Sequence, residues 1–247
     1  PLYLDMRAGI SDLNLFSETG VITALNGTLE VQGAPSSWRG HFSLQNQVES
    51  WRRADASADF TGNLSQITLT DVKGSWLDGT LAGSLAVDWS RRRMETVLKG
   101  RNLDPSRAAS RWKGRVNLDL SGHLVQPESG PVQAEIQAKL LESVFMGKSL
   151  TGTVDARIDG DRIDIRQLDA SGEGFRVSAA GKLDERLNLN IRLDDLGLWV
   201  EEARGKVIAD GWIRRSNEWI GGELRAWGEA LFFQGLSIDS LSLTAGH

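Results

Sequence analysis

The sequence predicts an all-β protein, built as a long antiparallel β-meander that curls into an elongated, taco-like trough with an apolar interior. Three observations predict this fold class. Apolar and polar residues alternate with a period of two from Leu13 onward, turn-forming residues separate the alternating segments, and glycine makes up 27 of 247 residues. That share is about 11%, against roughly 7% in average proteins, and it suggests many turns.

The clearest alternating segments cover residues 116–124, 132–138 and 187–193. Successive side chains of a strand point to opposite faces of its sheet, so each segment has one apolar and one polar face. Parallel sheets covered by helices would instead show continuous apolar runs separated by amphipathic stretches of roughly 10–15 residues. The alternation therefore favours antiparallel strands, about 14 of them by this spacing.

Short turn signals separate the predicted strands. They are Asp78-Gly79, Asp159-Gly160-Asp161, Gly172-Glu173-Gly174 and Gly221-Gly222. Asp-Gly and Gly-Gly pairs tolerate the positive φ angles that tight hairpins require. The pattern predicts hairpin after hairpin.

Two segments favour short helices. Asp104–Trp112 places an Asp at the N-cap position and a Pro directly after it, and the segment from Asp195 to Ala203 ends before Gly205. Both arrangements are typical of helix termini. We expect one or two one-turn helices between strands.

A short theme, glycine followed by alternating apolar residues, recurs along the chain. It begins at Gly27, Gly79, Gly114, Gly152, Gly205 and Gly222, which are 52, 35, 38, 53 and 17 residues apart. These intervals are close to multiples of roughly 17–19 residues, the length of one hairpin. We expect one elongated β-repeat segment over residues 1–247, with a possible sub-boundary near 195–205. The start on Pro1 suggests a piece of a longer chain.

The composition argues against several classes of protein. The chain has no cysteine, which excludes disulfide scaffolds and thiolate metal sites, and its net charge of −5 makes nucleic acid an improbable partner. No run of 18 apolar residues predicts a membrane-spanning helix.

No motif points to catalysis, and we expect neither an enzyme nor a bound metal or cofactor. Ser110 to Lys113 has the SxxK spacing without its partner motifs, and Asp159 to Asp164 resembles a calcium loop that lacks the later Glu. The histidines at 41, 123 and 247 share no ligand spacing, and His123 is expected to be solvated on a polar face.

Many strands with one apolar face each must shield that face in a barrel, a sandwich or a trough. About 14 strands at ~4.8 Å spacing would extend about 65 Å, which suits a trough. A closed sandwich core would produce the same alternation, and this alternative stays open.

The stretch from Leu98 to Leu124 contains Gly-Arg-Asn-Leu-Asp-Pro followed by Gly-Arg-Val-Asn-Leu-Asp-Leu. It resembles the recurrent element of the TamB and AsmA-like family, in which a strand ends in a G-x-x-L-D-P turn and resumes as alternating residues after a glycine. Ile67 to Leu85 and Ala203 to Gly246 are similar to further copies. The tetrapeptide Asn102-Leu-Asp-Pro105 favours TamB, the translocation and assembly module subunit, and its interior β-repeat region.

The resemblance implies a periplasmic β-sheet groove in the Gram-negative envelope. It implies phospholipid transport between the inner and outer membranes, assembly of outer-membrane proteins as in protein secretion, or both. The parent protein would be anchored in the inner membrane by an N-terminal helix and would pair with a barrel assembly protein, TamA or BamA, through regions outside this piece.

Eighteen residues are predicted to line the groove. They are Leu81, Leu85, Val87, Val116, Leu118, Leu120, Val132, Ile136, Val154, Ile158, Ile163, Ile165, Phe175, Val177, Leu187, Leu189, Ile191 and Leu224. Such a surface would accept phospholipid acyl chains or other apolar chains, since each buried CH₂ contributes about 0.8 kcal/mol.

Six residues could form a headgroup-binding rim, because they join indoles to cationic side chains near strand ends. They are Trp89, Arg91, Arg92, Arg93, Trp112 and Trp212. Tryptophan packing over strand ends, with arginine discouraging edge pairing, would explain the same pattern. The alternative function is a passive scaffold, or a β-sandwich with a closed core that binds a partner or carbohydrate.

Overall fold

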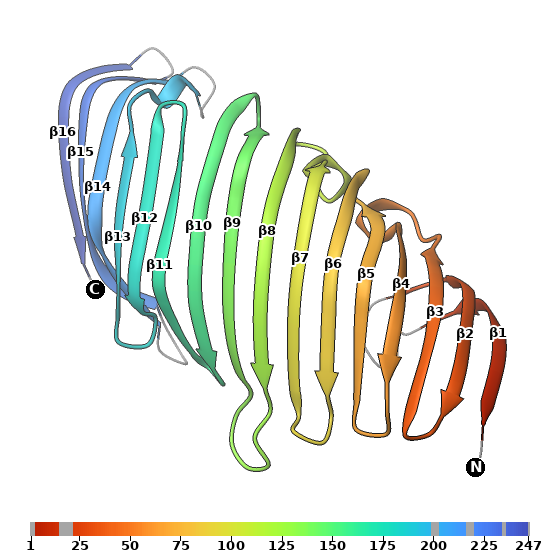
Figure 1. The fold of residues 1–247 in the computed structure, drawn as a ribbon. Coiled ribbons are helices and arrows are strands. Elements are labelled where there is room, and N and C mark those ends of the chain that lie inside the picture. Colours follow the sequence, from red (N-terminus) through yellow and green to blue (C-terminus); the bar gives the residue numbers. More distant parts are fainter. Residues whose placement is uncertain (1–2, 15–21, 199–202, 216–219, 234–235, 247) are drawn as a thin grey trace. The chain divides into compact units, whose positions relative to one another are not determined.

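The computed structural model describes residues 3–14, 22–198, 203–215, 220–233 and 236–246. Sixteen strands form one antiparallel sheet in which every strand pairs with its neighbours in the sequence (Figure 1). The sheet is an open meander and does not close into a barrel. The predicted all-β antiparallel fold is confirmed.

The strands are long, between 8 and 14 residues. They are β1 (Leu4–Leu13), β2 (Leu25–Ala34), β3 (Ser37–Asn46), β4 (Ala54–Gly62), β5 (Gln66–Trp76), β6 (Gly79–Asp88), β7 (Arg93–Leu103), β8 (Gly114–Val125), β9 (Gln133–Phe145), β10 (Lys148–Asp159), β11 (Arg162–Gly172), β12 (Phe175–Lys182), β13 (Arg186–Leu193), β14 (Ala203–Arg215), β15 (Ile220–Phe233) and β16 (Leu236–Gly246). The estimate of about 14 strands was too low, in part because β1 precedes the residue at which the alternation was first recognised.

The chain divides into two compact units. Unit 1 contains residues 1–130 and 140–147, and unit 2 contains residues 131–139 and 148–247, so that β9 contributes to both. The possible sub-boundary near 195–205 concerns a different position and stays a prediction.

Strand register keeps the apolar residues of unit 1 on one face. Leu29 of β2 lies opposite Phe42 of β3, which in turn lies opposite Ala58 of β4. Further along the sheet, Leu98 of β7 pairs with Leu120 of β8. Directly opposed residues share a face, so these pairings join the apolar stripes of successive strands into one surface, the apolar face of unit 1.

Unit 2 repeats the arrangement. Val177 of β12 lies between Ala170 of β11 and Ile191 of β13, and Ile191 lies opposite Ala209 of β14. Figure 1 shows β14, β15 and β16 as strongly bent strands. The residues joined by this register form the apolar face of unit 2.

Most described glycines lie within strands, which corrects the expectation that the glycine surplus serves turns. Only five described glycines lie between strands: Gly130, Gly147, Gly160 and Gly174 in turns and loops, and Gly197 in a short 3₁₀ turn after β13. Several others sit on the apolar faces, where a Cβ would overlap the backbone of the next strand. These glycines are Gly27, Gly40, Gly74, Gly83, Gly172 and Gly211. Their missing side chains let neighbouring strands crowd together on the apolar side, as a bent sheet requires.

The predicted turns are mostly confirmed. Leu77 and Asp78 both have positive φ in a two-residue turn, and Gly160 and Gly174 have φ of +60° and +72° in theirs. Gly221–Gly222 is an exception, because both residues lie inside β15, opposite Arg214 and Ile213. The hairpin signal was misleading there, since close approach of a neighbouring backbone also selects glycine.

Three short 3₁₀ helices interrupt the described meander: η1 (Ser50–Arg52), η2 (Pro105–Arg107) and η3 (Leu196–Leu198). The predicted helix after Asp104 is η2, shorter than the expected 104–112, and η3 lies within the predicted 195–203. Asp104 caps η2, and its carboxylate accepts a hydrogen bond from the backbone N–H of Ser106 at 2.9 Å. Hydrogen bonds from the hydroxyl and the backbone N–H of Ser106 lower the pKa of Asp104.

Replacing Gly40 with alanine should destabilise the protein by about 1–3 kcal/mol, because the new Cβ would overlap the Phe60 ring and the Glu30 carbonyl oxygen. Gly9→Ala is the matched control, since no atom lies within 4 Å of a Cβ at that strand position. Urea titrations monitored by circular dichroism measure the free energy of unfolding of both variants. Equal stability of the two variants would contradict the crowding on the apolar face.

Asp104→Ala should lower the free energy of unfolding by about 1 kcal/mol at pH 7, a typical value for a lost N-cap. The folded-state pKa is lowered, so the stabilisation is complete above about pH 4 and is lost as the pH falls through the folded pKa. The stability difference from the unaltered protein should therefore shrink as the pH falls from about 4 through the folded pKa. Asp104→Asn keeps a capping oxygen without a titrating group, and a pH-independent loss in Asp104→Ala would argue against the cap.

Candidate apolar binding face

The apolar faces of both units are only partly shielded from water. Among the described residues, seven apolar residues are buried: Ala58, Phe60, Leu103, Ala179, Leu187, Ala203 and Ala209. No large side chain in this part of the chain is completely buried. A closed core of this size would bury many leucines, isoleucines and valines completely. No second sheet covers the apolar side among the described residues.

The six lining residues predicted in unit 1 lie on its apolar face. Leu81, Leu85 and Val87 alternate along β6, and Val116, Leu118 and Leu120 alternate along β8. The register through β7 connects the two sets, because Gly100 lies opposite both Leu81 and Leu118. All six are partly exposed.

Ten predicted lining residues share the apolar face of unit 2. Val154, Ile158, Ile163, Ile165, Phe175, Val177, Leu187, Leu189, Ile191 and Leu224 are linked by pairings from β10 to β15. Leu187 is 5% exposed and the other nine are more accessible. Ile136 lies in β9 between Glu135 and Gln137, which make polar contacts on the opposite face. Val132 precedes β9 and is exposed.

Charged side chains pair with one another on the polar face. In unit 2, Arg166 donates to Glu135 at 2.9 Å and lies 3.5 Å from Asp155. The hydrogen bond to Glu135 raises the pKa of Arg166. In unit 1, His41 lies 2.8 Å from Asp59. Most of these groups are well exposed, so solvent screening leaves each pair with little effect on stability. Their main effect is to keep this face solvated.

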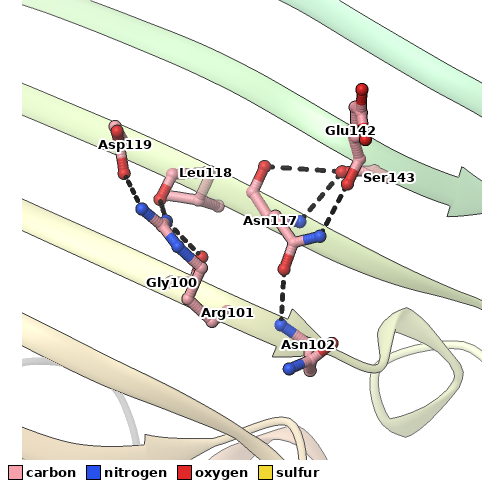
Figure 2. A network of polar contacts seen from close by, with 8 residues as sticks. All are labelled: Gly100, Arg101, Asn102, Asn117, Leu118, Asp119, Glu142 and Ser143. Atoms are coloured by element: carbon pink, nitrogen blue, oxygen red, sulfur yellow. Dashed lines mark hydrogen bonds and ion pairs between the residues drawn. The ribbon is translucent and has the colours of Figure 1, made fainter.

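A polar network ties β7, β8 and β9 together behind the apolar face of unit 1 (Figure 2). The side-chain oxygen of Asn117 accepts from the N–H of Asn102 at 2.8 Å, and its amide donates to the Glu142 carbonyl at 2.6 Å. The hydroxyl of Ser143, which is buried, accepts from the N–H of Asn117 at 2.9 Å. Asn102 has a φ of +56° at a bulge, so Asn117 satisfies backbone groups that the irregular ladder leaves unpaired.

Arg101 completes this network. Its guanidinium donates to the carbonyl oxygens of Gly100 and Leu118, each at 2.9 Å, and to the Asp119 carboxylate at 2.7 Å (Figure 2). Leu118 therefore presents its side chain to the apolar face while its backbone is anchored from the other side. The Asn-Leu-Asp-Pro segment begins at the bulge that this network holds in place.

The predicted rim residues lie at separate places. Trp89 and Arg91 to Arg93 lie between or at the ends of β6 and β7, whereas Trp112 precedes β8, at the opposite end of β7. Trp212 lies within β14 on the polar face, opposite Asn188 and Glu223, and the guanidinium of Arg186 lies 5.4 Å from its ring centre. Within unit 1, the length of β7 therefore separates Trp112 from Trp89 and the three arginines.

The β6–β7 turn exposes a cation. Asp88 accepts from the Ser90 hydroxyl at 2.7 Å and from the Arg91 N–H at 2.9 Å, and both bonds lower the pKa of Asp88. The side chain of Arg91 is 81% exposed and lies 3.8 Å from Asp88. Trp89 is held by a hydrogen bond from its indole N–H to the Leu64 carbonyl.

A hollow on the apolar face of unit 1 was missed by the sequence analysis. It encloses about 450 Å³ and is lined by Leu4, Leu29, Val31, Trp38, Phe42, Phe60, Ile67 and Leu69, from β1 to β5. The rings of Trp38 and Phe60 pack edge to face at 5.7 Å, and those of Phe42 and Phe60 stack at 6.5 Å. The alternation in these strands was visible, but their convergence on one hollow depends on register and bending, which no local pattern reports.

The motifs considered for chemistry have structural explanations. Asp159 to Asp164 forms the β10–β11 hairpin around Gly160, as expected for a turn. His123 lies in β8 and is partly buried with its Nε2 atom inaccessible, so the expectation of a solvated imidazole was wrong. His247 lies outside the described residues. No group of His, Asp or Glu in the described ranges is arranged to hold a metal ion.

The described part of the chain contains no helix with the length and apolar character needed to cross a membrane.

The fold and the site define the class of protein: it is an all-β protein, an open antiparallel meander with one apolar face and one charged face. The family model described as the TamB N-terminal domain matches residues 8–246. The chain therefore belongs to the TamB family, and it is a segment of a TamB-like envelope protein. No curated protein matched the chain, and no solved structure did.

Asn117→Ala should destabilise the protein by about 1–3 kcal/mol, because it leaves the Asn102 N–H and the Glu142 carbonyl without their side-chain partner. Asn190→Ala is the control, an exposed strand asparagine on the polar face of unit 2. Thermal unfolding compares the two. A loss no larger than that of Asn190→Ala would show that the network contributes nothing to stability.

Proposed function

We propose that this segment binds phospholipid acyl chains on its apolar faces and contributes to a hydrophobic groove between the inner and outer membranes. One observation carries the proposal: aliphatic side chains from successive strands form an apolar surface in each unit, partly exposed and with no covering layer among the described residues. Exposed apolar surfaces of this extent mark binding sites in proteins.

Acyl chains are the ligand that this surface fits best by its chemistry. Moving a 16-carbon chain from water to an apolar environment is worth about 13 kcal/mol at ~0.8 kcal/mol per CH₂. A chain that leaves one strand finds similar side chains on the next, because register continues the apolar stripe. A lipid moving along the sheet would not have to return to water between strands. Unfolded strands of outer-membrane proteins, with their apolar faces, could use the same surface during assembly.

Headgroups would remain at the sheet edges. Arg91 is suited to a lipid phosphate because its guanidinium is exposed and arginine binds phosphate oxygens through two N–H groups. Trp89, beside it, is 45% exposed, and indole favours the boundary between apolar and polar surroundings. Trp112, near Arg111 at 6.0 Å, is a second such position. Trp212 is placed on the polar face and is the weakest of the predicted rim residues.

The proposal includes the wider setting expected from the family. The segment would function in the periplasm, in a parent protein anchored in the inner membrane by an N-terminal helix. That parent would pair with TamA or BamA through another region and serve outer-membrane biogenesis. We propose no catalytic role, no cofactor and no nucleic-acid partner.

The two alternatives receive less support. A sandwich with a closed core requires a second layer over the apolar side, and the described strands form a single sheet. A carbohydrate platform built from Trp89 and Trp112 together would need both on one surface, whereas they lie at opposite ends of β7.

Photo-crosslinking residues at neighbouring positions on opposite faces test the proposal. Leu98 lies on the apolar face, and Val97 beside it is 46% exposed on the polar face. Leu189 and Asn190 form the equivalent pair in unit 2. After irradiation in cells, phospholipid should attach at Leu98 and Leu189 at least about tenfold more than at Val97 and Asn190, in line with the burial of several CH₂ groups. Mass spectrometry of the purified adducts is the measurement.

Val97 is the stringent control, because it is apolar and accessible yet on the other face. Equal lipid capture at Val97 and Leu98 would refute the assignment of the binding face. Capture of peptide in place of lipid at Leu98 would favour the sheltering of unfolded proteins.

A further inference from the structure

A small hollow of unit 2 is lined mainly by hydrogen-bond donors. It encloses about 360 Å³ at one end of the strands β10 to β13. This volume is at the small end of the roughly 300–1,000 Å³ of known ligand sites. Its polar lining residues are Ser149, Thr151, Ser171, Arg176, Arg192 and Asp194, and the other three, Leu150, Gly172 and Phe175, are their direct neighbours in the sequence.

Strand register brings four of the polar side chains into one row. Thr151 of β10 lies opposite Ser171 of β11, which lies opposite Arg176 of β12. Arg176 in turn lies opposite Arg192 of β13. Val177, the residue after Arg176, belongs to the apolar face of unit 2, so the row lies on the polar face. Directly opposed residues on one face are close neighbours, and the four side chains therefore share one surface.

The pair of Arg176 and Arg192 is electrostatically unfavourable, because like charges directly opposite each other on a sheet repel. A second like-charge pair of unit 2, Lys182 and Arg186, has a carboxylate nearby, since Lys182 donates to Glu185 at 2.8 Å. Arg176 is exposed and makes no ion pair with any residue that the structure describes. The row of the hollow therefore keeps a surplus of positive charge.

Asp194 orients Arg192 without neutralising the pair. The Nε atom of Arg192 donates to the Asp194 carboxylate at 2.9 Å, while the two terminal nitrogens of the guanidinium have no hydrogen-bond partner among the described residues. The hydrogen bond from Arg192 lowers the pKa of Asp194, and the charges of Lys206 and Arg176 lower it further. Three cations thus surround one carboxylate.

Hydroxyl groups add neutral donors beside the two guanidinium groups. The side chains of Ser149 and Ser171 make no hydrogen bond with a described residue, and the Thr151 hydroxyl makes only a long contact, 3.5 Å, with the Ser171 carbonyl oxygen. The next polar-face residue of β11, Asp169, already accepts a hydrogen bond from Gln167 at 2.6 Å. Donors from four neighbouring strands are therefore available to one ligand.

We propose that this hollow binds a phosphate group between Arg176 and Arg192. Each guanidinium can bind phosphate oxygens through two N–H groups, and the hydroxyls of Thr151 and Ser171 can donate to the remaining oxygens. A carboxylate, with two oxygens in one plane, would leave those hydroxyls unused. A bound phosphate dianion would also remove the repulsion between the two arginines, which accounts for their direct opposition.

The inference goes beyond the proposed function, because it concerns the polar face and does not depend on acyl chains at the apolar faces. Water-soluble phosphate esters and phospholipid headgroups both carry the phosphate group that the hollow fits. The experiment separates these two sources.

Isothermal titration calorimetry with inorganic phosphate and with glycerol 3-phosphate, at constant ionic strength in chloride, measures the binding. Arg176→Gln removes the cation that has no carboxylate partner. Arg225→Gln is the matched control, because Arg225 is an exposed strand arginine of the same face that lies opposite Asp210 and donates to Glu223 at 2.7 Å. Circular dichroism verifies folding, and Arg192→Gln is the second test variant.

The unaltered protein and Arg225→Gln should bind one phosphate group with a Kd of about 1 mM or less. Arg176→Gln and Arg192→Gln should each weaken the binding by about tenfold or more, since a charge-assisted contact is lost. In chloride alone, Arg176→Gln should unfold at the same temperature as the unaltered protein or at a higher one, because the substitution removes a repulsion.

Vesicles of phosphatidylglycerol and phosphatidylcholine provide the membrane arm of the experiment, measured by flotation. Binding of the soluble phosphates alone would support the site and assign it to soluble phosphate esters. Vesicle binding that is lost in Arg176→Gln would support the site and assign it to lipid headgroups. Equal affinities of Arg176→Gln and Arg225→Gln for the soluble phosphates would overturn it. Failure of both soluble phosphates to bind, with vesicle binding either absent or unchanged in Arg176→Gln, would overturn it as well.

Discussion

Antiparallel register is the constraint on which the rest of this structure depends. Because side chains alternate along a strand, a slip of one residue would move every apolar side chain of that strand to the charged face. The pairings of Leu98 with Leu120 and of Val177 with Ile191 avoid this from strand to strand. At bulges such as the one between Gly100 and Leu103, the extra residue is absorbed without exchanging the faces. The polar network around Asn117 fixes that bulge, so a set of hydrogen bonds on one side preserves a continuous apolar surface on the other.

Bending of the sheet requires space on its apolar side. Glycine supplies that space at Gly40, where the neighbouring Phe60 ring and the backbone of β2 occupy the volume of the missing side chain. An exposed apolar surface can nevertheless coexist with a stable sheet. Its side chains are partly protected by their neighbours on adjacent strands, and no second layer is needed to cover them among the described residues. A surface of this kind is ready to bind apolar ligands without unfolding any part of the sheet.

The two faces divide the chemistry of the protein. Ion pairs such as Arg166 with Glu135 keep one face hydrated and discourage association through it. The other face has no comparable charges within its apolar stripes, and cations such as Arg39 and Arg91 are found where the faces meet the turns or the polar side. An amphiphile matches this division, because its hydrocarbon and its charged group can be satisfied simultaneously only near a sheet edge. The proposed lipid binding therefore rests on the distribution of polarity and not on any single residue.

The sequence by itself determined the all-β class, the antiparallel order and the face on which residues such as Leu118 and Leu189 lie, because alternation and short turns are local properties. It also located the cap at Asp104, where a side chain bonds to a backbone group two residues away. It misjudged Gly221–Gly222, since a glycine required by a neighbouring strand looks the same as a glycine required by a turn. Only the tertiary structure decided that the apolar faces are open, that Trp38, Phe42 and Phe60 form one hollow, and that Trp212 lies on the polar face of β14. Those features arise from bending and from contacts between strands, whose register and distance no local pattern of residues encodes.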